Sequence, residues 1–303
     1  MVDVVLLGCG GSMPTPQRFL SASLILYKGR KILIDCGEGT QVSMRMCNSG
    51  FKTIDVICIS HIHGDHIVGL PGLLGTIGNS GRTEPITIIG PEGIITAVNG
   101  LRTIVEWLPY EINIIENPKE SLSFINDEID ISFFAVDHSA PCLGYSFYVK
   151  RSPRFNVENA LKNNVPKKIW NILQKGTKSI EVDGVVYKRE MVLGEERRGI
   201  KISLITDSRP VNGMSDFIDA SDLFICEGTY GSDDDIEKAI KNKHMIFREA
   251  ACLAKEGNVK KLLLTHFGTA MGDPYMFENN AKEVFENTIL GSDRLGISLD
   301  FTE

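Results

Sequence analysis

Long apolar runs are missing from this chain of 303 residues. No stretch approaches the roughly 18 consecutive apolar residues that a membrane-spanning helix needs. The first residues run directly into strand-like sequence without a basic region, so we expect no secretory signal peptide. Low-complexity tracts and internal repeats are also missing, and the composition, with 43% hydrophobic and 23% charged residues, is ordinary. The chain is therefore expected to fold as a globular protein.

Paired cysteines are missing too. The seven cysteines are an odd number and are scattered without any Cys-x-x-Cys spacing. Cys36, Cys58 and Cys226 lie in apolar, strand-like runs, where reduced cysteines pack as small hydrophobic residues. A disulfide framework is not expected, and a cytoplasmic location fits this cysteine usage best.

The chain also lacks an excess of positive charge, because its formal net charge is −7. This argues against broad, nonspecific binding of nucleic acid driven by overall charge. It leaves open a local basic face, since contacts to phosphates depend on where individual lysines and arginines lie.

The hydrophobic pattern predicts alternating strands and helices. Strands are expected up to residue 7 and at 23–27, 31–34, 55–59, 86–89, 112–115, 122–125, 129–136, 143–149, 200–205, 223–226 and 259–264. Helices are expected at 42–47, from 68 onward, and at 93–108, 157–174, 234–241, 246–256 and 277–290. The sequence thus predicts a layered α/β domain with two packed sheets over 1–303, in which 152–198 form an insertion with a hairpin near residue 183.

One short stretch, 60–66, concentrates the chemistry of the chain with the sequence Ser-His-Ile-His-Gly-Asp-His. His61 and His63 are two residues apart, so in extended backbone their side chains leave the same face. After the glycine, Asp65 and His66 can point toward a second, neighbouring position. Because neutral imidazoles and carboxylates are ligands of Zn²⁺-like ions, the stretch predicts a metal site, with room for two ions.

Further polar residues share one kind of position, directly after an expected apolar strand. They are Asp35, His61, His138, Asp207, Glu227 and His266. Residues at strand ends can be directed by loops toward one crevice of a layered α/β protein. The chain has only six histidines, and this bias in their positions predicts one composite site.

These motifs resemble the metallo-β-lactamase superfamily, and within it ribonuclease Z, the tRNA 3′-end processing endonuclease. The supporting stretches are 6–10, 34–41, 61–75, 206–209, 226–230 and 264–267. The resemblance implies an α/β (α+β) fold, a four-layer αββα sandwich with a metal site at the sheet ends. It also implies a metal-dependent hydrolase.

The resemblance implies a role for each of the polar residues at the site. His61, His63 and His138 would hold one zinc ion, Asp65, His66 and His266 a second, and Asp207 would bridge the two, with Mn²⁺ or another divalent ion as an alternative metal. Asp35 would orient a ligand histidine through its free ring nitrogen, or would merely cap the following turn.

Asp65 would also orient or deprotonate the attacking water. His244 would donate a proton to the leaving oxygen, and Glu227 would hold its imidazole charged; the alternative is an ordinary residue at a helix start. The chain departs from the family pattern at four neighbouring positions, which are Cys226, Gly228, Met245 and Ile246.

The largest departure lies in the insertion, where the family carries a basic arm rich in glycine and proline that grips tRNA. Here Pro166 is followed by Lys167 and Lys168 without the Gly-Pro repeat. A phosphate-binding patch and a solvated helix face explain these lysines equally well. Arg18 stands in an altered N-terminal loop and is a further candidate for substrate contact.

Two enzymatic functions follow from the resemblance. The first is endonucleolytic removal of 3′ trailers from pre-tRNA, and the second is hydrolysis of a small phosphodiester by a relative that has lost its RNA grip. A binding protein without metal is disfavoured, because every ligand position is filled. The family resemblance also implies a homodimer, and the lack of a long apolar run predicts no membrane association.

Overall fold

The computed structural model describes residues 1–105 and 107–302 and divides the chain into two compact units. The larger unit comprises Met1–Val149 and Ile200–Asp300, and the smaller one comprises Lys150–Gly199 with the residues from Phe301 onward. Among the helices of the described residues, none has the length and hydropathy needed to cross a membrane.

The first large sheet of the larger unit has seven strands in the order β16-β1-β2-β3-β4-β5-β6. Its strands are β1 (Val2–Gly8), β2 (Ala22–Tyr27), β3 (Arg30–Ile34), β4 (Ile54–Cys58), β5 (Ile86–Gly90), β6 (Ile112–Glu116) and β16 (Leu295–Leu299). Strands β3 to β6 are parallel, whereas β16, β1, β2 and β3 pair antiparallel.

The second large sheet also has seven strands, in the order β15-β14-β13-β12-β9-β8-β7. They are β7 (Leu122–Phe124), β8 (Ile129–Val136), β9 (Cys142–Arg151), β12 (Arg197–Ile205), β13 (Leu223–Glu227), β14 (Leu262–Thr265) and β15 (Thr288–Leu290). Strands β12 to β15 are parallel, and β7, β8 and β9 form an antiparallel meander.

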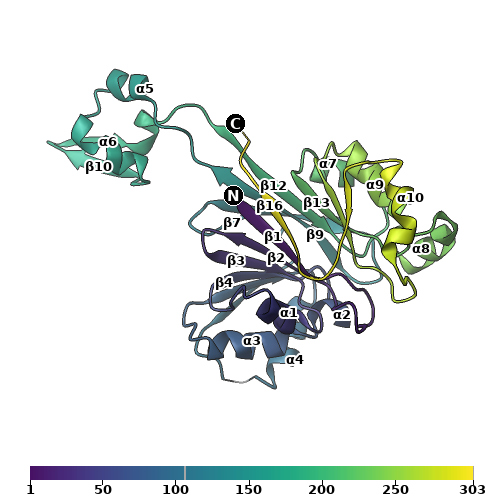
Figure 1. Cartoon of the computed structure of the whole chain (residues 1–303). Coiled ribbons are helices and arrows are strands. Elements are labelled where there is room, and N and C mark those ends of the chain that lie inside the picture. The colour runs from purple at the N-terminus through teal and green to yellow at the C-terminus, as the bar shows by residue number, and fades with distance from the viewer. Residues whose placement is uncertain (106, 303) are drawn as a thin grey trace. The chain divides into compact units, whose positions relative to one another are not determined.

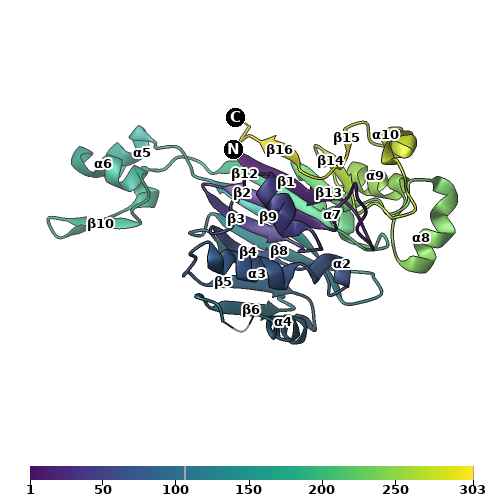
Figure 2. The same cartoon turned by 60° about the horizontal axis from the view of Figure 1, so that its bottom comes forward.

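Helices cover the outer face of each sheet in the larger unit (Figures 1 and 2). The first sheet is accompanied by α1 (Thr40–Met46), α2 (Gly64–Ile67), α3 (Leu70–Asn79) and α4 (Ile94–Arg102). The second is accompanied by α7 (Met214–Ile218), η2 (Asp233–Asp235), α8 (Ile236–Asn242), α9 (Phe247–Glu256), η3 (Pro274–Phe277) and α10 (Glu278–Lys282). The predicted four-layer αββα sandwich is confirmed.

The two sheets are joined by polar contacts as well as by apolar packing. The hydroxyl of Tyr145, which is fully buried on β9, donates to the carbonyl of Ile59 at 2.6 Å. The amide of Leu143 donates to the carbonyl of Ser60 at 2.9 Å. Because buried polar groups must find partners, these bonds fix β9 against the loop that carries the predicted metal ligands.

The smaller unit contains α5 (Val157–Lys162), α6 (Lys167–Gln174), β10 (Ser179–Val182), β11 (Val185–Lys188) and η1 (Arg189–Val192). A small core of its own is made by Ala160, Val165, Ile169, Leu173 and Val192. The expected hairpin near residue 183 is confirmed, with Asp183 and Gly184 at positive φ in its turn. That 152–198 are an insertion in a single hydrolase domain stays a prediction.

Some expected helices are wrong in extent. The helix expected at 277–290 ends at Lys282, and Thr288–Leu290 instead pairs with β14 as a strand. The helix expected at 93–108 ends at Arg102. A single helix at 157–174 is replaced by α5 and α6, because Pro166 has no backbone N–H to donate inside a helix and lies at the N-cap of α6.

All seven cysteines are free in the structure, as expected from their spacing. Cys58 on β4, Cys226 on β13 and Cys36, two residues after β3, are fully buried. Burial raises the pKa of each of these thiols, so they act as small apolar side chains.

Candidate metal centre

The polar residues predicted at strand ends come together at one end of the two sheets. Asp35 follows β3, and His61, His63, Asp65 and His66 follow β4. The second sheet contributes His138 after β8, Asp207 after β12, Glu227 at the end of β13 and His266 after β14. His244 joins them from the segment between α8 and α9. The site is thus built from both sheets.

The backbone turns sharply at three of these positions. Asp35, Asp207 and His266 have φ values of 59°, 36° and 57°. Residues with a side chain rarely adopt this left-handed region, although Asp and His do so more often than most. Each such backbone conformation costs on the order of 1–3 kcal/mol and persists only where the surrounding structure holds it. Residues of this kind cluster at functional sites.

Three histidines form a first group of donors. The Nε2 atom of His61 lies 3.0 Å from Nδ1 of His63, and Nε2 of His138 lies 3.2 Å from the same Nδ1. All three offer a ring nitrogen within 4.8 Å of one another. Two nitrogens on a tetrahedral zinc ion lie about 3.3 Å apart when each Zn–N bond is about 2.0–2.1 Å. The group therefore has the spacing of a zinc-ligand set.

A second group consists of Asp65, His66, Asp207 and His266. The Nε2 atoms of His66 and His266 are 3.3 Å apart. Nε2 of His266 lies 3.4 Å from Oδ2 of Asp65. This set combines imidazoles with carboxylates, which suits the same class of divalent ion.

Asp207 lies between the two groups. Its Oδ1 is 3.2 Å from Nε2 of His266 and 3.5 Å from Nε2 of His66. Its Oδ2 is 3.6 Å from Nε2 of His61 and 3.8 Å from Nε2 of His138. One carboxylate thus presents one oxygen to each set of histidines, as a bridging ligand must.

Four of the histidines are held by hydrogen bonds on their outer nitrogen, Nδ1. His66 donates to Oδ2 of Asp35 at 2.8 Å, and His61 donates to the hydroxyl of Ser60 at 3.1 Å. The Ser60 hydroxyl in turn donates to Asp35 at 2.9 Å. Such bonds fix the tautomer and leave Nε2 free to bind an ion.

A matching arrangement serves the second sheet. His138 donates from Nδ1 to the carbonyl of Lys243 at 3.2 Å. His266 donates from Nδ1 to the hydroxyl of Thr229 at 3.0 Å, and Thr229 donates to Oε2 of Glu227 at 2.5 Å. Each of these rings therefore also presents Nε2 to the centre of the site.

Glu227 contacts His244 directly. Nδ1 of His244 lies 3.1 Å from Oε2 and 3.2 Å from Oε1 of the fully buried carboxylate. The amide of Ser208 donates to Oε1 at 2.6 Å and fixes the carboxylate. Burial opposes protonation of His244, but the charge and hydrogen bond of Glu227 outweigh it and raise the pKa of the imidazole to about 9.

Two members of the ligand set, His61 and Asp207, have the protonation state that suits metal binding, whereas the carboxylates of Asp207 and Asp35 outweigh burial and raise the pKa of His66. Burial is the main cause that lowers the pKa of His61 to about 2, so this ring is neutral. Burial opposes ionisation of Asp207, but the imidazoles of His266 and His66 hold the pKa of its carboxyl well below the usual range. Neutral imidazoles and an ionised carboxylate are the forms that bind divalent ions.

One atom of the cluster is left without a hydrogen bond. Oδ1 of Asp207 is buried and finds no partner of acceptable geometry, although two ring nitrogens face it. An uncompensated buried anionic oxygen is costly, and a cation among the same donors would remove that cost. The residues present therefore fit a divalent metal centre.

The glycine-rich loop at 8–12 packs against the site. A Cβ atom on Gly11 would lie 2.4 Å from the ring of His266, so only glycine fits this close approach. The amide of Ser12 donates to Oδ2 of Asp65 at 2.6 Å and orients that carboxylate. The backbone of the loop thus contacts two of the predicted metal ligands, His266 and Asp65.

None of the three residues proposed for substrate contact belongs to these groups of candidate ligands. The guanidinium of Arg18 donates to the carbonyl of Gly272 at 2.7 Å and to that of Met271, which ties two loops together. Lys167 and Lys168 are exposed on α6 of the smaller unit. Whether these three residues contact a substrate stays a prediction.

Two supporting residues were not predicted from the sequence. Ser60 and Thr229 supply the hydroxyls through which Asp35 and Glu227 hold His61 and His266. A local signal exists, since each hydroxyl residue lies within two positions of a predicted site residue at a strand end. Each hydroxyl has one hydrogen-bond partner nearby in sequence, His61 or Glu227, and one from a distant segment, Asp35 or His266.

Comparison with known proteins agrees with this geometry. Ribonuclease Z of Clostridium beijerinckii is 66% identical over 307 residues, and that of Clostridioides difficile 58% identical over 306 residues, with 100% of each chain covered in both cases. A family profile described as Anti-Pycsar protein Apyc1 matches residues 2–104.

Solved structures resemble the chain as well. The short form of human tRNase Z has a TM-score of 0.69 at 26% identity and covers 98% of this chain and 99% of its own. The metallo-β-lactamase fold protein YhfI of Bacillus subtilis has the same TM-score at 20% identity, with 98% of each chain covered, and shows the fold alone.

The fold and the cluster of histidines and carboxylates define a metal-dependent hydrolase of the metallo-β-lactamase fold. Within that class the chain belongs to the ribonuclease Z family, because relatives with that name match it over their full length at 58–66% identity.

The role of Asp35 can be tested with Asp35→Asn. We expect this variant to bind zinc roughly 10- to 100-fold more weakly, because an amide holds the Nδ1–H of His66 less strongly than a carboxylate does. Zinc affinity is measured by competition with a chromogenic chelator. Asp216→Asn, on an exposed residue of α7, is the control. Equal zinc affinity in Asp35→Asn and wild type would show that Asp35 only shapes the turn.

Proposed function

We propose that the protein is a two-zinc endoribonuclease that removes the 3′ trailer from pre-tRNA. The observation that carries the proposal is the pair of Glu227 and His244 beside the seven predicted metal ligands. A hydrolase that opens a β-lactam or a thioester does not need a charged imidazole poised for a ribose oxygen. The similarity to ribonuclease Z from two clostridia supports the same substrate.

Two zinc ions would be held by the groups described above, with Asp207 between them. His61, His63 and His138 would form one set, and Asp65, His66 and His266 the other. When bound, such ions lower the pKa of a water ligand to about 7 and stabilise charge on the phosphoryl group. Asp35 would keep His66 in the tautomer that presents Nε2 to the ion.

Asp65 would position the attacking water. Its Oδ2 is already fixed by the amide of Ser12 and faces His266. The carboxylate can therefore accept a hydrogen bond from water in one orientation and take its proton as attack proceeds. A new bond forms between the water oxygen and phosphorus.

His244 would protonate the leaving group. As the bond between phosphorus and O3′ of the ribose breaks, that oxygen needs a proton to leave as a hydroxyl. The imidazolium, held by Glu227, can give this proton and later regain one from solvent. The products are a tRNA with a 3′-hydroxyl and a trailer with a 5′-phosphate.

A small phosphodiester is the second candidate substrate. The altered insertion and the net charge of −7 favour it, since both weaken a general attraction to RNA. Lys167 and Lys168 on the exposed face of α6, together with Arg18, would supply contacts to RNA phosphates if pre-tRNA is the substrate.

Cleavage of a 3′-extended pre-tRNA tests the proposal. We expect the zinc-loaded protein to cut once, after the discriminator nucleotide, and also to hydrolyse bis(p-nitrophenyl) phosphate. His66→Ala should abolish both activities, because it removes a ligand of the second ion. Gel analysis of end-labelled RNA and release of p-nitrophenolate measure the two.

The control for folding is the circular dichroism spectrum of His66→Ala. Diesterase turnover without any cut in the pre-tRNA would support the small-phosphodiester function instead. Undiminished turnover in His66→Ala would overturn the metal assignment itself.

The role of His244 can be separated from metal binding by the choice of leaving group. We expect His244→Ala to lower kcat on pre-tRNA by about 10²- to 10⁴-fold, the usual contribution of a general acid. Hydrolysis of bis(p-nitrophenyl) phosphate should change far less, because p-nitrophenolate leaves without a proton. Equal losses on both substrates would place His244 among the metal ligands rather than as an acid.

A homodimer in the cytoplasm is the proposed state of the protein. Helix α1 exposes Val42 and Met46, one turn apart, with exposed fractions of 49% and 55%, and Val68 adds a third exposed apolar side chain. Contiguous apolar side chains on a surface mark interaction sites. Val42 and Met46 on α1 are therefore the proposed centre of the dimer interface.

Sedimentation equilibrium tests the dimer. We expect the wild-type protein to have about twice the mass of one chain, and the double variant Val42→Glu/Met46→Glu to be monomeric, because two charges would be buried in the interface. Met276→Glu, at another exposed methionine, should remain dimeric. A monomeric wild type would contradict the proposal, and a dimeric double variant would exclude this face.

A further inference from the structure

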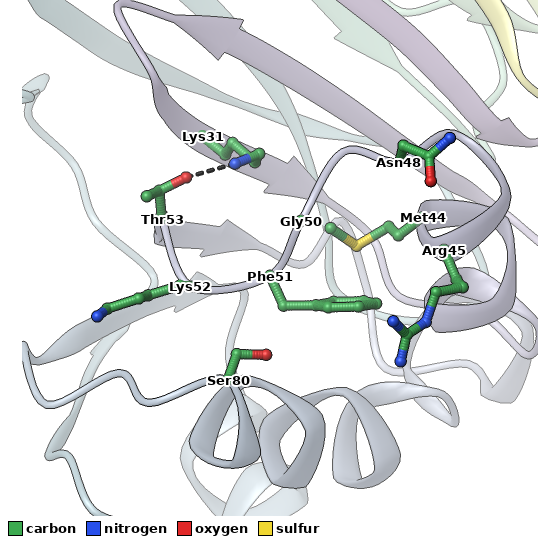
Figure 3. Close-up of a pocket in the computed structure, with 9 residues that line it drawn as sticks. All are labelled: Lys31, Met44, Arg45, Asn48, Gly50, Phe51, Lys52, Thr53 and Ser80. Atoms are coloured by element: carbon green, nitrogen blue, oxygen red, sulfur yellow. Dashed lines mark hydrogen bonds between the residues drawn. The ribbon is translucent and has the colours of Figure 1, made fainter.

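A pocket of about 430 Å³ lies in the larger unit, at the amino-terminal end of β3 (Figure 3). Asp35, which supports the metal centre, follows the other end of the same strand, so the pocket is separate from that site. Its walls come from the end of α1, the loop that leads to β4 and Ser80 after α3.

A buried lysine forms part of this pocket. Lys31 is 7% exposed, and its ammonium makes one hydrogen bond, to the hydroxyl of Thr53. Within residues 1–105 and 107–302 it forms no ion pair. An ammonium group has three donors, so two remain for another partner.

The nearest acidic group is already occupied. Asp55 accepts hydrogen bonds from the side chains of Arg30 and Arg82. Burial is the main cause that lowers the pKa of Lys31, and Asp55 offsets it only in part. A buried ammonium is normally paired, so Lys31 lacks its counter-charge.

Arg82 shows how this protein satisfies a buried cation elsewhere. It is 1% exposed, and its guanidinium bonds to Asp55 at 3.0 Å and to the carbonyls of Lys52, Glu84 and Pro85. Lys31, on β3, has no such set of acceptors among the residues that the structure describes. The difference points to an acceptor that is supplied from outside the chain.

The rim adds further positive charge. Arg45 and Lys52 line the pocket and are exposed, and none of the described lining residues carries a carboxylate. The carboxyl-terminal ends of α1 and α3 bring partial negative charges of about half a unit each. Together these do not neutralise three cations, so the pocket is suited to an anion.

The pocket also has an apolar part. Phe51 and the fully buried Met44 line it together with the polar groups (Figure 3). Its volume falls in the range of about 300–1,000 Å³ that is typical of small-molecule sites. A free inorganic ion would leave most of this space unfilled.

We propose that this pocket binds the phosphate group of a small organic anion of about the size of a nucleoside monophosphate. The phosphate pairs with Lys31 at the base, and the positive charges of Arg45 and Lys52 on the rim attract it. The organic part lies against Phe51 and Met44. This site is independent of the proposed RNA cleavage and would exist in a protein without it.

Isothermal titration of the zinc-loaded protein with adenosine monophosphate tests the proposal. His66→Ala serves as a second background, because a phosphate can also bind at the zinc ions. In both backgrounds we expect Lys31→Met to raise the Kd for adenosine monophosphate at this pocket by at least about tenfold, because a hydrogen bond to a charged group is lost. Lys52→Gln, on the rim, should raise it by a few fold.

Lys119→Met, at an exposed lysine outside the pocket, is the matched control and should leave the Kd unchanged. Circular dichroism checks that each variant is folded, and the Lys52→Gln result holds if Lys31→Met does not fold. An isotherm in wild type that disappears entirely with His66→Ala would overturn the proposal. The proposal would also be overturned if Lys31→Met bound the nucleotide as tightly as wild type but bound pre-tRNA more weakly. The pocket would then bind RNA.

Discussion

The geometry of the site depends on the position of one carboxylate, that of Asp207. Its two oxygens face two sets of histidines, with Oδ1 toward His66 and His266 and Oδ2 toward His61 and His138. Three of these four partners lie in loops after other strands, and they come from both sheets. The buried carboxylate can therefore reach four imidazoles only if the two sheets pack with these strand ends side by side.

Two further carboxylates keep the histidines in place by the same device. Asp35 holds His66 directly and His61 through the hydroxyl of Ser60. Glu227 holds His244 directly and His266 through the hydroxyl of Thr229. In each case one carboxylate and one hydroxyl orient two imidazole rings. Asp35 orients two candidate metal ligands, whereas Glu227 orients one candidate ligand, His266, and the proposed proton donor, His244. The proposed proton donor and a candidate metal ligand thus share the hydrogen-bond network around Glu227.

The sequence predicted which residues meet at the site better than it predicted the last two strands of the chain, β15 and β16. The residues that meet at the candidate site could be found because apolar strands are locally recognisable, and each of these strands is followed by a polar residue. The strand β16 was missed and β15 was taken for helix, since both are defined by pairing with distant strands rather than by their own pattern. The pocket around Lys31 could not be predicted either, because it depends on an unpaired charge that only the packed structure reveals.

The central claim is that Asp207 joins two separate metal positions. An anomalous difference map at the zinc edge, from crystals grown with zinc, tests it most directly. The account predicts two peaks about 3.5–4 Å apart, one beside His61, His63 and His138 and the other beside Asp65, His66 and His266, with Asp207 bonded to both. A single peak, or a second peak that Asp207 does not contact, would contradict it.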